Sequence, residues 1–269
     1  MSAHPLYAYG LDMPSLATPA IADDELVDML SLIKGADSVE LKLTIPEASQ
    51  RSTLEALGID PIGAQVRLVH FYDTPDLTLE KAGVVVRARR VAQKGDDSVI
   101  KLRPVVVSEL PPELRESPEC VVEVDAVPGG HVCSASLKGT PRTSVRDVAQ
   151  GVAPLRKLFS KDQRAFFAEH APEGIGFEDL SLLGPIFVLK LKGVPEGFAR
   201  KMVVELWLYP DGTRILELST KCAPAEAFQV AAEGRAFLAE RGIEIDGDAQ
   251  TTKTRKALQF FSKQLTPTG

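Results

Sequence analysis

The chain has 269 residues, of which 44% are hydrophobic and 25% are charged, a composition typical of a globular protein that buries a core. Its net charge of −6 argues against general binding to nucleic acid or to a membrane surface, so an anion site has to be a local concentration of basic residues. No metal-binding spacing involves the three cysteines, no secretory signal is visible, and no apolar run approaches the ~20 residues of a membrane-spanning helix. We therefore expect reduced thiols and a cytoplasmic protein.

The chain begins with a segment that is predicted to differ from the rest. Residues 1–37 are predicted to form an arm rich in Pro, Ala and Ser, followed by a short helix with an acidic first turn at Asp23-Asp24-Glu25. Residues 38–264 are predicted to form one domain. Gly129-Gly130 opens a stretch with helical patterns near 144–151 and 161–170, so residues 128–184 are interpreted as a helical insertion. Further helices are predicted over 47–57, 224–241 and 250–264.

Eight segments of the predicted domain alternate polar and apolar residues with the period of a β-strand. They cover residues 38–45, 65–73, 84–91, 98–104, 119–127, 186–193, 201–209 and 214–220. Pro210-Asp211-Gly212 is a turn signal that joins the last two as a hairpin. Consecutive antiparallel strands with flanking helices predict an α+β fold built on an up-and-down β-barrel.

The charged residues of these segments share one face of each strand. The basic set is Lys42, Arg87, Arg89, Lys101, Arg103, Lys190 and Lys192, and the acidic set is Glu40, Glu123, Asp125, Glu205 and Glu217. If the strands close into a barrel with this face inward, helices would cover the apolar outer face. Such an interior suits a polyanion such as a linear phosphate, because Arg and Lys bind phosphate oxygens and carboxylates bind Mg²⁺ or Mn²⁺.

At this point the sequence resembles the CYTH superfamily, also called triphosphate tunnel metalloenzymes. Val39-Glu40-Leu41-Lys42 is similar to its ExExK strand, and the run from Phe71 through Thr74-Pro75-Asp76, Leu79 and Gly83 to Arg87-Ala88-Arg89 is similar to its YFDTPD…L…G…LRxR pattern. Ile100-Lys101-Leu102, Glu123-Val124-Asp125, Glu205, Glu217 and the late helix with Lys253-Thr254-Arg255-Lys256 follow in the family's order. The resemblance covers about residues 38–264.

The resemblance implies an eight-stranded antiparallel closed β-barrel, a tunnel that binds a triphosphate with Mg²⁺ or Mn²⁺. It implies that Glu40, Glu205 and Glu217 hold metal and that Glu123 and Asp125 hold water or a second cation. Phosphates would be bound by Lys42, Arg87, Arg89, Lys101, Arg103, Lys190, Lys192 and Lys253. Two positions depart from the pattern, because Ser38 and Ser219 stand where the family has acids. We expect weaker metal binding at these positions.

These patterns also have plainer interpretations. Glu40, Lys42 and the Arg87 strand could face solvent, Lys190 and Lys192 could lie on an edge strand, and Lys253 could lie on a solvated helix face. Glu123 and Asp125 could simply neutralise neighbouring bases. Trp207 and Tyr209, which share the parity of Glu205, could indicate a face packed under a helix.

The sequence therefore predicts a metal-dependent phosphohydrolase that acts on a short linear triphosphate. A water near Glu217 would attack the terminal phosphoryl group, and Lys42 would assist. Inorganic triphosphate is favoured because no cluster for stacking a base or a thiazolium ring is visible. A non-catalytic module that binds polyphosphate or nucleotide, and an adenylate cyclase of the same fold, are the alternatives. A homodimer is possible.

Overall fold

A computed structural model describes residues 30, 33–245 and 253–265 of the protein. The predicted N-terminal arm, most of the helix after it, and the start of the last predicted helix lie outside the described residues. None of the described helices is long and apolar enough to cross a membrane.

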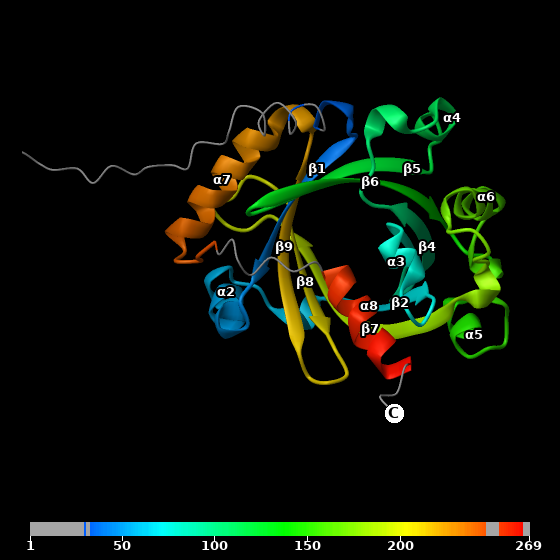
Figure 1. Ribbon diagram of the computed structural model, residues 1–269. Helices are drawn as coiled ribbons and strands as arrows, with labels where there is room; N and C mark the ends of the chain where they lie inside the picture. Colours follow the sequence, from blue (N-terminus) through cyan, green and yellow to red (C-terminus); the bar gives the residue numbers. More distant parts are fainter. Residues whose placement is uncertain (1–29, 31–32, 246–252, 266–269) are drawn as a thin grey trace, which may run out of the picture.

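Nine strands form a closed barrel in the order β1-β5-β6-β4-β3-β2-β7-β8-β9. Their bounds are β1 Ser38–Ile45, β2 Gln65–Asp73, β3 Val84–Val91, β4 Gly95–Leu102, β5 Cys120–Val127, β6 Gly130–Gly139, β7 Ser181–Gly193, β8 Met202–Leu208 and β9 Arg214–Cys222. Figure 1 shows the strands around a central space, with helices outside.

The predicted eight-stranded antiparallel barrel is corrected in two respects. Residues Gly130–Gly139, which the sequence predicts to begin a helical insertion, form β6 between β5 and β4. The polar alternation of this strand is weak in the sequence, because Ser134 and Ser136 are uncharged and only Lys138 carries a charge on the inward face. The barrel is also mixed, since β1 pairs with β5 in parallel and with β9 in antiparallel orientation. The α+β class and the closure of the barrel are as predicted.

The helices lie between and after the strands. The α-helices are α2 Gln50–Ala56, α3 Thr78–Lys81, α4 Pro112–Arg115, α5 Val145–Ala149, α6 Lys161–His170, α7 Ala227–Glu240 and α8 Lys253–Leu265. Short 3-10 turns occupy Glu47–Ser49, Pro61–Gly63, Val107–Glu109, Leu155–Leu158, Phe177–Asp179 and Pro224–Glu226. In Figure 1, α8 and α3 lie over one end of the barrel, and α7 and α6 lie on opposite sides of it.

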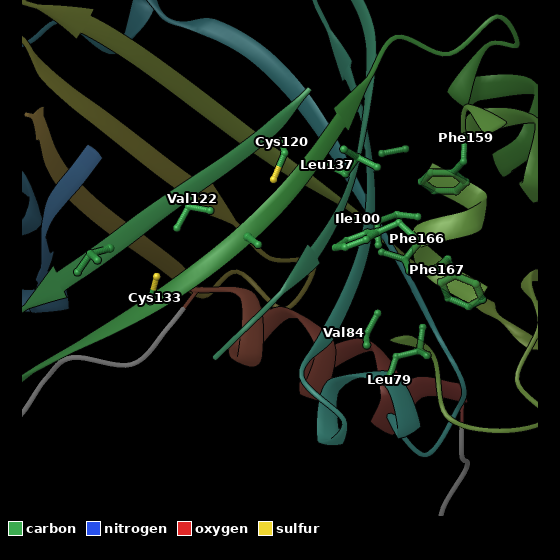
Figure 2. Close-up of a cluster of buried hydrophobic side chains, with 14 of the residues drawn as sticks. Leu79, Val84, Ile100, Cys120, Val122, Cys133, Leu137, Phe159, Phe166 and Phe167 are labelled. Carbon is green, nitrogen blue, oxygen red and sulfur yellow. The ribbon is translucent and has the colours of Figure 1, made fainter. Parts of the chain in front are cut away.

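Apolar residues on the outer face of the barrel form two clusters under these helices. One lies outside β3 to β6, where Val84, Ile100 and Leu137 pack with Phe166 and Phe167 of α6 (Figure 2). The other lies outside β1, β8 and β9 and includes Phe237 and Leu238 of α7. Burial of apolar area at about 25 cal/mol per Å² drives this packing and leaves the charged face of each strand inside.

A third apolar cluster lies at one end of the barrel. Ala257, Leu258 and Phe261 of α8 pack with Val188 and Trp207, whose side chains point into the barrel. We call this end the α8 end. At the opposite end β3 ends at Val91 and β4 begins at Gly95, so we call it the hairpin end.

Candidate functional site

The barrel encloses a cavity of about 510 Å³, the tunnel cavity. Among the described residues, eleven basic and six acidic side chains line it, a formal excess of five positive charges in a chain whose net charge is −6. The bases are Lys42, Arg67, Arg87, Arg89, Lys101, Arg103, Lys138, Lys190, Lys221, Lys253 and Arg255, and the acids are Glu40, Glu80, Glu123, Asp125, Glu205 and Glu217. This local concentration of cations favours a polyanion.

Twelve of the thirteen residues singled out from the sequence line this one cavity. The exception is Lys192, which is exposed near the end of β7 and lies outside the cavity lining. Lys253, whose side chain is 17% exposed, reaches into the cavity and does not lie on a solvated helix face. The strand residues that the sequence pattern predicts to face the barrel interior therefore line the cavity, with the exception of the last lysine of β7.

Three carboxylates from two parallel strands lie together, and we call them the acidic triad: Glu40, Glu123 and Asp125. Each offers an oxygen within 4.8 Å of the others. The parallel register places Ser38 beside Glu123 and Glu40 beside Asp125, so inward residues of β1 and β5 meet in pairs. Three hard oxygen donors at this spacing fit a divalent cation such as Mg²⁺ or Mn²⁺.

Asp125 is the centre of charge pairing in the triad, and its side chain has no solvent exposure. Lys42 Nζ lies 2.7 Å from Asp125 Oδ1 and 3.2 Å from Glu40 Oε2, and Arg103 Nη2 lies 3.3 Å from Asp125 Oδ2. Burial alone would raise the pKa of Asp125, but Lys42, Lys101 and Arg103 lower it to about 2. Asp125 therefore stays ionised, and it neutralises tunnel bases as well as standing in the triad.

Ser38 and Ser219, the two serines at which the sequence departs from the resembled pattern, both contact triad residues. Ser219 Oγ donates to Glu40 Oε1 at 3.0 Å, and Ser38 Oγ donates to Glu123 Oε2 at 3.4 Å. Lys221 forms an ion pair with Glu123. Neutral hydroxyls thus stand beside the triad and add no negative charge to it.

The other two predicted metal ligands form a separate group, the Lys253 cluster: Lys253, Glu205 and Glu217. Glu205 and Glu217 are directly opposite each other on β8 and β9. Lys253 of α8 is ion-paired with both, with its Nζ 2.6 Å from Glu217 Oε1. Burial alone would raise the pKa of Glu205, yet Lys253 and Lys190 hold it well below its ordinary value. The ammonium group of Lys253 therefore lies between the two carboxylates, in the place predicted for a metal ion.

Aromatic residues hold the Lys253 cluster in place. Trp207 Nε1 donates to Glu205 Oε2 at 3.2 Å, and Lys253 Nζ lies 5.3 Å from the centre of the Trp207 ring. Tyr209 Oη donates to the Lys253 carbonyl oxygen at 3.2 Å, and its ring contacts Phe260 of α8. The strand face with Trp207 and Tyr209 therefore packs under α8, which is one of the plainer interpretations of the sequence. The same face also places Glu205 in the cavity.

Several cations in the cavity are buried without full compensation. Arg87 Nε has no hydrogen-bond partner among the described residues, and burial together with Arg89 lowers the pKa of Arg87 to about 9. Burial lowers the pKa of Lys101 to about 8, although Asp125 offsets part of this effect from 3.7 Å. Arg89 is bound by both oxygens of Asp97. An anion bound near Arg87 and Lys101 would supply the missing counter-charge.

The turn before β3 shapes the α8 end of the cavity. Asp73 accepts from the backbone N–H groups of Thr74, Leu79 and Glu80, so it stabilises the turn and fixes the start of α3. Gly83 follows with φ +76°, and a Cβ there would lie 2.7 Å from the Arg103 carbonyl oxygen. Only glycine allows this close approach, which positions Arg103 in the cavity wall.

Sequence reasoning missed several residues of the lining, namely Arg67, Lys138, Lys221, Glu80 and Arg255. Lys221 follows Ser219 at the same strand parity, so extending the β9 pattern by two residues would have found it. Lys138 belongs to the overlooked strand β6. Arg255 lies 2.9 Å from Glu80, a contact between α8 and α3 that no local pattern could indicate.

No family model matches the chain, and no curated protein matches its sequence. Several solved structures are similar to it, including one from Bacillus halodurans and one from Hippeastrum. A proposed adenylate cyclase from Bacillus halodurans has a TM-score of 0.56 at 13% identity, covering 82% of this chain and 97% of that one. HpAC1 from Hippeastrum, described as a proposed adenylyl cyclase with a dominant triphosphatase activity, has a TM-score of 0.54 at 16% identity, covering 82% and 95%.

This chain shares their fold. The likeness supports, on structure alone, the CYTH-like tunnel fold that the sequence resemblance implied. At these identities it shows the fold and does not by itself transfer an activity or a substrate.

Proposed function

We propose that the protein is a metal-dependent phosphohydrolase that acts on a short linear triphosphate, with inorganic triphosphate as the favoured substrate. The observation that carries the proposal is a closed barrel whose cavity holds a formal excess of five positive charges together with the acidic triad. The activity described for HpAC1 is of the same kind. A small-molecule substrate also agrees with the negative net charge of the whole chain.

The acidic triad would hold the divalent cation, Mg²⁺ or Mn²⁺, because its three carboxylates provide the oxygen ligands that these ions prefer. When bound, the ion would neutralise phosphate oxygens and help to orient the terminal phosphoryl group. The fit requires Lys42 to give up part of its contact with Glu40, 3.2 Å away, in favour of substrate oxygens.

The remaining residues would bind and orient the substrate. Arg87 and Lys101, which lack full counter-charge, would bind phosphate oxygens directly, with Lys42, Arg89, Arg103, Lys190 and Lys253 around them. Glu217 would accept a proton from the attacking water, and Lys253, 2.6 Å away, would hold its carboxylate in position. The basic residues would stabilise the charge that spreads over the phosphoryl oxygens.

The test is phosphate release from tripolyphosphate, ATP and thiamine triphosphate, each with Mg²⁺, Mn²⁺ or EDTA, alongside a measurement of cyclic AMP from ATP. Release that needs the metal supports a triphosphatase and names its substrate. Arg87→Ala is expected to lower turnover by about 10²–10³-fold, whereas Lys157→Ala, an exposed lysine outside the cavity, leaves it unchanged. Turnover that survives EDTA or the loss of Arg87 would contradict the proposal.

A binding module without turnover is the second candidate, and the Lys253 cluster favours it. Both Glu205 and Glu217 are already paired with Lys253, and Ser219 stands where a further acid is expected. Calorimetry with tripolyphosphate separates the two functions, since tight binding without phosphate release would mark a module. Cyclic AMP production would instead indicate the adenylate cyclase.

A further inference from the structure

A second depression adjoins the tunnel cavity at the hairpin end of the barrel, with a volume of about 470 Å³. Arg67 and Lys190 line both it and the tunnel cavity, so the two spaces share a wall of basic side chains. Lys94, in the turn between β3 and β4, and Lys192 continue this wall outward. We call these four residues, Arg67, Lys94, Lys190 and Lys192, the basic groove.

The basic groove leads out of the cavity on one side of the hairpin end. A further depression at this end is lined by three acids, Asp97, Glu119 and Asp162, with Lys138 as its single base. An anion that extends beyond the cavity would therefore be attracted to the groove side and repelled from the other. At the α8 end, α8 packs against Trp207 and Val188, which also line the cavity.

The charges of the groove are only partly used within the fold, where Arg67 donates from Nε and Nη2 to Gln65 Oε1 at 3.2 and 2.8 Å. Within the described ranges no carboxylate lies within ion-pair distance of Arg67, Lys94 or Lys192, while Lys190 pairs with Glu205 at 2.7 Å. Asp60, the acid in the groove lining, accepts the Ile62 backbone N–H at 2.9 Å and caps a 3-10 turn. Lys192 is thus an exposed cation beside the cavity, although it is not part of the cavity lining.

We propose that the protein binds linear polyphosphate chains longer than three phosphates, with one chain end in the tunnel cavity and the following phosphates along the basic groove. This inference rests on the proposed function, because it assumes that the tunnel cavity binds the terminal phosphates of the chain. In the part of the chain that the structure describes, no aromatic side chain lines the groove, so these residues offer no platform on which a nucleobase could stack. Repeating phosphates match a row of lysine and arginine charges better than an organic group does.

The experiment compares the affinities of tripolyphosphate, ATP and long-chain polyphosphate for the wild-type protein and for the double variant K94A/K192A, by calorimetry in EDTA and in Mg²⁺. The double variant is expected to lose about three- to tenfold in affinity for the long chain, since each exposed charge contributes modestly. Tripolyphosphate and ATP should change by less than twofold. The control K157A/K263A removes the same charge from exposed sites outside both depressions.

The proposal would be overturned if the double variant bound the long chain with unchanged affinity. It would also be overturned if the affinity fell equally for all three ligands, or if it fell for ATP and the long chain but not for tripolyphosphate. The loss for the long chain should also shrink as salt is raised. These readouts are binding constants, so they remain informative if no phosphate is released. Failure of the groove and failure of the triphosphatase are therefore separate results.

Discussion

The acidic triad and the Lys253 cluster line the same cavity, yet they meet their cations in different ways. Parallel pairing of β1 with β5 gathers Glu40, Glu123 and Asp125 within 4.8 Å, and their basic partners approach from several strands. Antiparallel pairing of β8 with β9 sets Glu205 opposite Glu217, and α8 places one lysine between them. Both groups contain carboxylates, so the difference between them lies in the strand pairing and in the lysine that α8 adds to the second group.

The largest expected difference between the groups is in stability. Asp125→Ala would leave Lys42, Lys101 and Arg103 without their shared carboxylate and is expected to cost about 3–5 kcal/mol of unfolding free energy. Glu217→Ala should cost about 1–2 kcal/mol, because Lys253 keeps Glu205. Urea denaturation without metal or phosphate measures both. Equal losses would mean that the triad is no more tightly coupled than the Lys253 cluster.

Metal binding should separate the groups next. Mn²⁺ is expected to raise the Tm, and the concentration that gives half of this rise measures its binding. Glu40→Gln should increase that concentration by at least about tenfold, because it removes a triad ligand. Glu205→Gln should change that concentration by less than about threefold, because Lys253 already fills that place. The comparison uses thermal shifts in the presence of tripolyphosphate. A larger effect of Glu205→Gln would move the metal to the Lys253 cluster.

A smaller effect should appear as a pH dependence of anion binding. Burial lowers the pKa of Lys101 to about 8, so Lys101 loses its positive charge as the pH rises through that value. Affinity for tripolyphosphate should fall several-fold between about pH 7 and 9. Lys101→Arg keeps the charge over this range and should remove that part of the fall. Parallel titrations of the two proteins cancel the ionisation of the ligand, and identical profiles would contradict the role of Lys101.

Much of this site could be predicted from strand parity, because alternation fixes which residues face inward once a barrel closes. Register could not be predicted, since the parallel pairing of β1 with β5 joins segments far apart in the chain. Strand β6 was missed because Ser134 and Ser136 carry no charge to mark the inward face. Lys192 follows the parity but lies near the end of β7, where inward parity no longer places a residue in the cavity.

The smallest expected effect concerns the serine beside the triad. Ser219→Glu would place a fourth carboxylate next to Glu40, which Ser219 now contacts at 3.0 Å. We expect Mn²⁺ binding to tighten a few-fold and metal-free stability to fall by about 1 kcal/mol through like-charge repulsion. Ser219→Ala is the control that removes the hydroxyl without adding charge. Weaker Mn²⁺ binding by Ser219→Glu would show that the metal does not lie at the triad.

The most direct test of the account is the position of a bound ion. A crystal grown with Mn²⁺ and tripolyphosphate would show manganese by its anomalous scattering and phosphate by its density. The account predicts manganese in contact with Glu40, Glu123 and Asp125, with phosphate oxygens near Arg87 and Lys101. Manganese between Glu205 and Glu217 in place of Lys253, or phosphate outside the tunnel cavity, would contradict it.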